Sequence, residues 1–133
     1  MSDESTPRVD DDVIELASRV FDLAREGRSD ELGQYVDAGV PANLTNAKGD
    51  TLLILSAYHG HADAVALLLA RGADHARVND RGQTALAAAV FKQSPETVGH
   101  LLTAGADPDH GQPSARATAE FFGLPAMTEL LGR

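Results

Sequence analysis

Cysteine and tryptophan are absent from this chain of 133 residues, and only 5% of its residues are aromatic. The lack of cysteine excludes a disulfide framework, a zinc–thiolate site and a cysteine nucleophile. No apolar run approaches the roughly 20 residues that a membrane-spanning helix requires. Because 43% of the residues are still hydrophobic, we expect one small domain whose interior is built from alanine and aliphatic side chains.

Basic residues are also scarce: 11 Lys and Arg stand against 20 Asp and Glu, which gives a formal net charge of −9. A nucleic-acid partner is therefore not expected, because binding to a phosphate backbone depends on clustered Lys and Arg. The N-terminal segment MSDESTPRVDDD is acidic and polar where a signal peptide would be basic and then apolar. We expect residues 1–12 to form an acidic, disordered tail and the protein to be cytoplasmic.

The chain does contain a repeated pattern of glycines. Helix-like apolar segments end at Gly39, Gly72 and Gly105, which are spaced 33 residues apart, and a similar continuation follows each glycine. Other positions recur at the same interval, namely Gly27 and Gly60, Gly49 and Gly82, and Thr51 and Thr84. A period of this size indicates a stack of small supersecondary units rather than a globule around one core.

The clearest unit, GDTLLILSAYHGHADAVALLLARGAD at residues 49–74, resembles an ankyrin repeat, whose family pattern is roughly G-x-T-P-L-H-x-A-x-x-x-G-H-x-x-x-V-x-x-L-L-x-x-G-A-D. The resemblance extends over residues 13–133. It implies an all-α solenoid of about four helix-turn-helix units with short β-turn loops. The family's Thr-Pro-Leu-His stretch is TLLI at residues 51–54 and TALA at residues 84–87, so a histidine that ties neighbouring repeats in the family is missing.

The repeat also predicts where the helices lie and which residues they bury. Expected helices span about 13–26, 30–38, 52–59, 63–70, 85–92, 95–103, 115–122 and 125–131. The first should be capped by Asp12 and should present one apolar face from Val13 to Ala24. Leu68 and Leu101 occupy equivalent positions and are expected to be buried between repeats. The first unit resembles a capping repeat, and the last unit is a truncated cap.

Few residues are arranged for catalysis or metal binding. His59, His61 and His75 could suggest a metal site, but His61 falls on the family's structural histidine and no Cys or convergent Glu completes a shell. No serine lies in a strand–turn–helix elbow, and the glycines punctuate repeats rather than form a phosphate loop. We therefore expect neither a catalytic site nor a cofactor.

In the ankyrin family the β-turn tips and the exposed ends of the first helices line a concave groove that binds other proteins. Carried over by position, the resemblance implies these protein-binding residues: Arg25, Glu26, Lys48, Asp50, Tyr58, His59, Asp80, Arg81, Gln83, Phe91, Lys92 and Phe121. Tyr58, Phe91 and one of Phe121 or Phe122 should form an aromatic stripe, because such side chains anchor interfaces. The alternative is that these rings only cover the joints between repeats.

The resemblance thus favours a non-catalytic protein-interaction module: a small, monomeric, bacterial regulator or inhibitor that binds one partner protein in its groove. Two alternatives are weighed against it. One is a catalytic or metal-binding protein on a helical scaffold, and the other is a structural spacer in a larger assembly.

Overall fold

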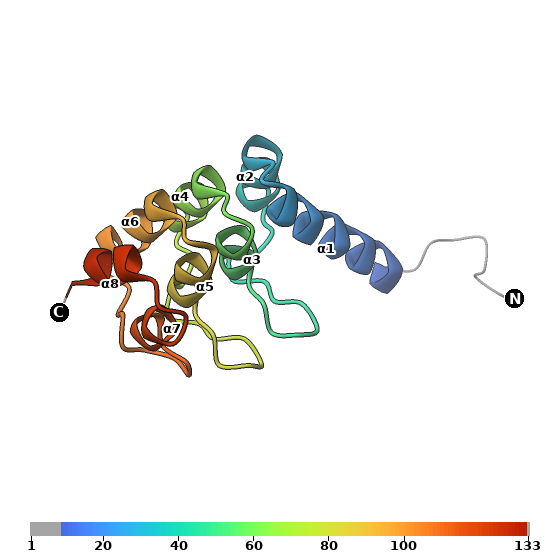
Figure 1. Ribbon diagram of the computed structural model, residues 1–133. Coiled ribbons are helices and arrows are strands. Elements are labelled where there is room, and N and C mark those ends of the chain that lie inside the picture. Colours follow the sequence, from blue (N-terminus) through green and yellow to red (C-terminus); the bar gives the residue numbers. More distant parts are fainter. Residues whose placement is uncertain (1–8, 133) are drawn as a thin grey trace, which may run out of the picture.

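The computed structural model describes residues 9–132, and these form eight helices joined by turns and loops (Figure 1). The helices are α1 (Val9–Glu26), α2 (Ser29–Asp37), α3 (Leu52–Tyr58), α4 (Ala62–Ala70), α5 (Ala85–Lys92), α6 (Pro95–Thr103), α7 (Ala115–Phe121) and α8 (Pro125–Leu131). Each odd-numbered helix packs against the even-numbered helix that follows it, so the chain forms four helix-turn-helix units.

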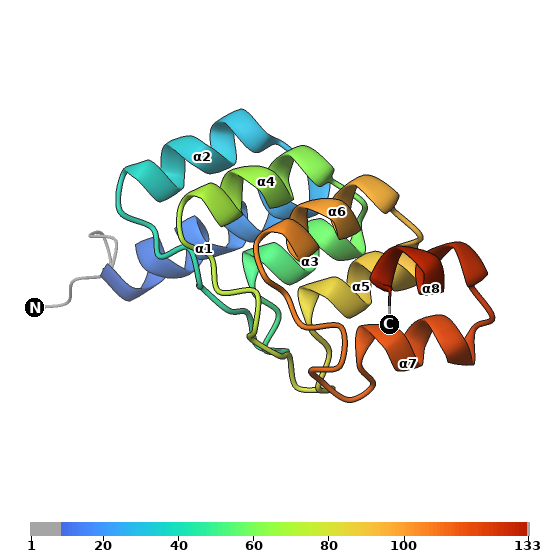
Figure 2. The same cartoon turned by 90° about the vertical axis from the view of Figure 1, so that its left-hand side faces the viewer.

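The four units stack so that their helices form two layers. The front helices α1, α3, α5 and α7 contact one another in chain order, and the back helices α2, α4, α6 and α8 do the same. Figures 1 and 2 show the two layers and the loops between units, which project from one edge of the stack. The all-α solenoid of four units expected from the sequence is confirmed.

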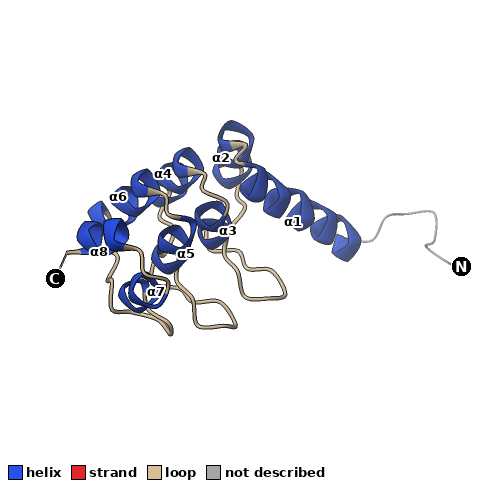
Figure 3. Ribbon diagram, viewed as in Figure 1, coloured by secondary structure: helices blue, strands red, loops and turns tan. Residues whose placement is uncertain are grey.

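Strand content agrees with the expectation from the sequence. Residues 9–132 contain no strand (Figure 3). Two isolated bridges pair Thr45 with Thr51 and Gly111 with Ser114, at the bases of inter-unit loops. The loops therefore contain turns and isolated bridges and do not form a sheet.

Helix α1 departs most from the sequence-based expectation. It begins at Val9, so the prediction that Asp12 caps it is wrong. It extends beyond its neighbours (Figure 1), and Val13 and Leu16 are consequently exposed while Val20 is buried. The predicted apolar face is thus buried only in the C-terminal half of the helix. Residues 9–12 are helical, and the rest of the predicted disordered tail lies outside the described residues.

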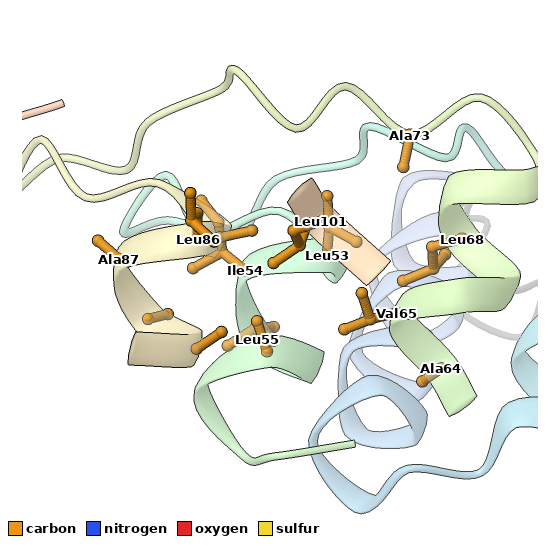
Figure 4. Close-up of a cluster of buried hydrophobic side chains, with 14 of the residues drawn as sticks. Leu53, Ile54, Leu55, Ala64, Val65, Leu68, Ala73, Leu86, Ala87 and Leu101 are labelled. Carbon is orange, nitrogen blue, oxygen red and sulfur yellow. The ribbon is translucent and has the colours of Figure 1, made fainter. Parts of the chain in front are cut away.

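The core lies between the two layers and is centred on α3 and α5. Every residue from Leu52 to Ala57 and from Ala85 to Val90 is buried. Each of these helices has a front helix on both sides and a back helix behind it, so it has little free surface. The back helices contribute Leu68 and Leu101, which are fully buried as predicted (Figure 4).

Local sequence signals set the ends of the front helices. Thr51 and Thr84 cap α3 and α5, because their hydroxyl oxygens accept the N–H groups of residues 54 and 87 at 3.0 and 3.1 Å. At the turn within each unit the backbone φ is positive, and the residues there are Gly27, Gly60, Gln93 and Gly123. Gln93 adopts a φ of 60° without being glycine, a conformation that strains an L-residue with a side chain.

Two asparagines build the loops that separate the units. Asn46 and Asn79 each use their Oδ1 atom to accept two backbone N–H groups, two and four residues later, at 2.9–3.0 Å. Asparagine favours such turns because its short side chain can hydrogen-bond to the backbone that follows it. The two loops therefore have the same shape, 33 residues apart in the sequence.

Hydrogen bonds join neighbouring units where the family histidines are missing. The Asp80 N–H donates to the Lys48 carbonyl at 3.0 Å, and the Gln112 N–H donates to the Gly82 carbonyl at 2.9 Å. His110 Nε2 lies 2.8 Å from the Ala76 carbonyl oxygen. These contacts run along the loops and fix the spacing between units.

Candidate protein-binding groove

The edge of the stack that carries the front-helix ends and the inter-unit loops is hollowed into a groove. Two hollows of about 800 Å³ each lie along it. One is bounded by α3, α5, α7 and the loop before α7, and the other by the end of α1, α3, α5 and the two asparagine loops. Tyr58, Arg81, Gln83 and Ala88 line both hollows, so the two adjoin, and we treat them together as the groove.

Aromatic rings run in an unbroken series along this groove. We call this series the aromatic stripe: His59, Tyr58, Phe91, Phe122 and Phe121. The ring centroids of successive members are 5.3, 5.9, 5.3 and 4.9 Å apart. The Tyr58 and Phe91 rings are stacked with an interplanar angle of 3°. Such distances are those of favourable aromatic pairs, so the rings hold one another in place.

The stripe remains open to solvent. The exposed fraction is 42% for Tyr58 and 44% for Phe91, and it rises to 52% for Phe122 and 83% for Phe121. Rings that only covered the joints between repeats would be largely buried. Each of these rings has one side packed on a neighbour and another side facing water, which leaves apolar area for a partner to cover.

The structure places Phe122, rather than Phe121, against Phe91. The sequence leaves the third member of the stripe open between Phe121 and Phe122 and names only Phe121 among the binding residues. Phe122 is the C-cap residue directly after α7, and its ring lies 5.3 Å from that of Phe91. Phe121 contacts the stripe through Phe122. Side-chain direction at a helix end decides this, and an alignment contains no information about it.

Cationic groups surround the α1 end of the groove. Burial lowers the pKa of the His59 imidazole, and the charges of His61, Lys92 and Arg25 lower it further. His59 is therefore held toward its neutral form by its neighbours. His61 has a structural role, because its Nε2 atom lies within hydrogen-bonding distance, 2.7 Å, of the Arg25 carbonyl oxygen in the preceding unit.

The candidate residues in the loops differ in their surroundings. Lys48 and Arg81 are exposed and line the groove. Asp50, expected at an exposed turn tip, is instead buried, and its Oδ1 accepts a hydrogen bond from the Asn79 side chain at 2.9 Å. Its carboxylate joins two loops, which leaves little of it for a partner.

Ten of the twelve residues chosen from the sequence line the groove. The two that do not are Glu26 and Lys92. Glu26 lies 3.9 Å from Arg28, to which it is weakly paired. The stem of Lys92 lies against Gly60, where an added Cβ atom would be 3.2 Å from Lys92 Cε. Both residues sit beside the groove rather than in it.

The sequence missed groove residues from the last unit and from the helix interiors. Pro113, Ala117, Thr118 and Glu120 complete the hollow around the phenylalanines. The last unit is three residues shorter than the others, so the repeat period could not assign these positions.

No group of three or more His, Asp or Glu side chains within residues 12–132 is placed to hold a metal ion. None of the helices described for these residues combines the length and the apolar character that crossing a membrane requires.

Comparison with known proteins gives the family. A family model for ankyrin repeats in three copies matches residues 21–112, from the buried part of α1 to the loop before α7. Over 67 residues the chain is 50% identical to a Pseudomonas aeruginosa protein that is named as an ankyrin repeat protein. This match covers 50% of the chain and 39% of that relative, so the chain spans well under two thirds of the relative's length. The family model covers more than half of the chain, and the stacked units and capped front helices agree with it; the chain belongs to the ankyrin repeat family.

Proposed function

We propose that this chain is a non-catalytic module that binds one partner protein in its concave groove. In this proposal it acts as a small bacterial regulator or inhibitor, monomeric and cytoplasmic. Ankyrin repeats are in general protein–protein interaction modules, and the bacterial assignment is supported by the Pseudomonas relative.

The observation that carries the proposal is the aromatic stripe. Tyr58 and Phe91 belong to adjacent full units and stack with their planes almost parallel. Exposing such rings to water is unfavourable, and a partner that covers them gains apolar burial at little cost in side-chain entropy, since each ring has few rotatable bonds. Interface anchors are drawn from this class of residue.

A capture experiment with matched variants tests the proposal. The immobilised protein and its Phe91→Ala and Leu130→Ala variants are each exposed to lysate of the source organism, and retained proteins are compared by quantitative mass spectrometry. Leu130 is a fair control because it is exposed to nearly the same fraction, 42% against 44% for Phe91, but lies on back helix α8.

The proposal predicts a protein that the parent and the Leu130→Ala variant retain and the Phe91→Ala variant loses. A protein retained equally by all three variants would place the binding surface elsewhere on the stack. Retention of a large multiprotein complex by all three would favour a structural spacer.

A further inference from the structure

We propose that the segment bound in the groove is acidic and carries a large apolar side chain: its carboxylates pair with Arg81 and Lys48 and approach His59, and its apolar side chain packs on the rings of Tyr58, Phe91 and Phe122. This inference rests on the proposed function and names the chemistry of the partner.

The pairing of the basic side chains is the first argument. Among the Lys and Arg side chains of residues 12–132, six arginines form ion pairs: Arg19, Arg25, Arg28, Arg71, Arg77 and Arg116. The three that form no ion pair within the described residues are Lys48, Arg81 and Lys92. All three lie in or beside the groove.

This distribution is unexpected for a chain with 20 acidic and 11 basic residues. With carboxylates in such excess, an exposed cation usually has a partner nearby. Exposed carboxylates lie on the back helices as well, for example Asp30 and Asp63. The unpaired cations, by contrast, are confined to the concave edge, where a ligand's negative charge would be favoured.

The acidic groups near the groove do not cancel this arrangement. Asp50 is buried and hydrogen-bonded to Asn79, and Glu26 lies nearest to Arg28. Asp80 and Glu120 are exposed, the first at a loop tip and the second on α7 beside the phenylalanines. Asp80 and Asp50 line the hollow at the α1 end, but Arg25, Lys48 and Arg81 line it too, so cations outnumber carboxylates there, and Glu120 lies at the opposite, aromatic end.

The positions of the charges and the rings fix the order of features in the ligand. Arg81 and Tyr58 both line the two hollows, so a cation and an aromatic ring adjoin at the centre of the groove. From this centre the rings continue toward α7 and the cationic groups toward α1. A segment lying along the groove would place its carboxylates over one part and its apolar side chain over the other.

Peptide selection tests the chemistry directly. A display library of random 16-residue peptides is selected against the immobilised full-length protein, and the enriched peptides are synthesised and titrated by fluorescence polarisation. We expect enriched peptides to contain more Asp and Glu than Lys and Arg and to share a large aliphatic or aromatic residue.

Matched variants then locate the binding. Arg81→Glu and Phe91→Ala should each weaken the enriched peptides by about tenfold or more. Arg77→Glu makes the same change of charge at an arginine that is already paired with Asp74, and Leu130→Ala removes an apolar side chain of similar exposure. Both controls should change the affinity by less than about twofold, and circular dichroism verifies that all four variants are folded.

A pH series adds a second test, because the affinity would not depend on the protonation of His59 if the groove had only a structural role. In the free protein the pKa of His59 is lowered by burial and by His61, Lys92 and Arg25. A carboxylate placed beside His59 would raise that pKa in the complex, so binding would take up a proton. Affinity should therefore increase as the pH falls from 8.0 to 5.5, by about three- to tenfold, and be flat in His59→Gln. His100→Gln, on back helix α6, should keep the slope.

The outcomes separate this inference from the proposed function. Basic or neutral enriched peptides that still lose affinity in Phe91→Ala would overturn the acidic chemistry and leave the groove as the binding site. If the enriched peptides bind Arg81→Glu and Phe91→Ala as tightly as they bind the parent, both the acidic chemistry and the proposed binding in the groove are contradicted. Failure to enrich any peptide would overturn the inference of a linear acidic segment, while the capture experiment would still decide the proposed function. If the affinity of the parent for the peptides does not change with pH, the placement of a ligand carboxylate beside His59 is wrong.

Discussion

Side chains on the concave edge divide into those that join the units and those that remain open to a partner. His61 is fixed on the Arg25 carbonyl oxygen, and Asp50 is fixed on Asn79. Tyr58 and Phe91 stack on each other and keep more than two fifths of their surface in water. Residues of the second kind are the ones whose loss should reduce binding without unfolding the protein.

Truncation of an aromatic ring is the first prediction. Tyr58→Ala and Phe91→Ala should each weaken partner binding by about 1–3 kcal/mol, because each removes an anchor of the groove. Each should also lower the free energy of unfolding by about 1 kcal/mol through the lost ring pair. Titration calorimetry with the captured partner and urea unfolding measure the two effects. The account is wrong here if both variants bind as the parent does.

Burial predicts the opposite pattern for the core leucines. Leu68→Ala and Leu101→Ala should each lower the free energy of unfolding by about 2–5 kcal/mol, because both side chains are fully buried and would leave cavities. Urea unfolding followed by circular dichroism gives the loss. Leu130→Ala, whose side chain is exposed, is the control and should be close to neutral. Parent-like unfolding of both core variants would contradict the packing described for α4 and α6.

Gln93 gives a prediction of increased stability. It adopts a φ of 60° at the position where the units before and after it have glycine. Gln93→Gly should raise the free energy of unfolding by about 0.5–1 kcal/mol, because glycine tolerates this conformation, although its freer unfolded state offsets part of the gain. The urea midpoint is the measurement, and a lower midpoint would show that the glutamine side chain stabilises the fold in a way its geometry does not reveal.

At the scale of single residues, the sequence predicted where the residues lie in the repeat better than it predicted which other residues they contact. The repeat period located Tyr58, Phe91 and the buried leucines, since these recur at fixed phases of the unit. It could not show that Asp50 is buried or that Phe122 contacts Phe91, because both depend on contacts between units. Ring direction and loop-to-loop hydrogen bonds are three-dimensional properties that no single repeat contains.

Among the structural elements, the inter-unit loops set the spacing of the stack, and two glycines show how. Gly82 has a φ of +79°, and an added Cβ atom would lie 2.6 Å from the Gln112 carbonyl oxygen. Gly72 has a similar φ of +85°, but an added Cβ atom there would meet no atom within 4 Å. At both positions the backbone conformation would strain an alanine, but only at Gly82 would the added Cβ atom also collide with a neighbouring loop.

Gly72→Ala should therefore cost about 1–2 kcal/mol from the left-handed backbone alone. Gly82→Ala should cost clearly more, because the Gln112 backbone must also move away and the hydrogen bond between the two loops is strained. Thermal and urea unfolding of both variants measure the difference. Equal losses would mean that the loop contact is not needed for stacking.

Helix positions were predictable because local signals and the repeat agree. Seven of the eight helices begin within one residue of their expected positions at a cap or turn that the sequence marks, such as Thr51 or Thr84. The start of helix α1 was not predictable in this way. No repeat precedes this helix, so the repeat period gives no start position for its acidic N-terminal turns. Its exposed Val13 and Leu16 show that an amphipathic pattern alone does not guarantee a neighbour.

At the scale of the whole molecule, the same stacked units that form the core also form the proposed binding groove. The main helix contacts of each unit are with adjacent units, and the groove extends over all four units through residues from α1, α3, α5 and α7. A ligand that lies along the groove therefore contacts several units at once and should stabilise their stacking by mass action. The central claim is that this edge, and not the layer of back helices, is where a partner protein is bound.

Site-specific photocrosslinking in the source organism tests that claim most directly. A photoreactive phenylalanine analogue is placed in turn at Phe91 in the groove and at Leu130 on the back layer, positions of nearly equal exposure. After irradiation of intact cells, the account predicts one discrete adduct, a single partner protein, from position 91 and none from position 130. An adduct from position 130 with none from position 91 would contradict it.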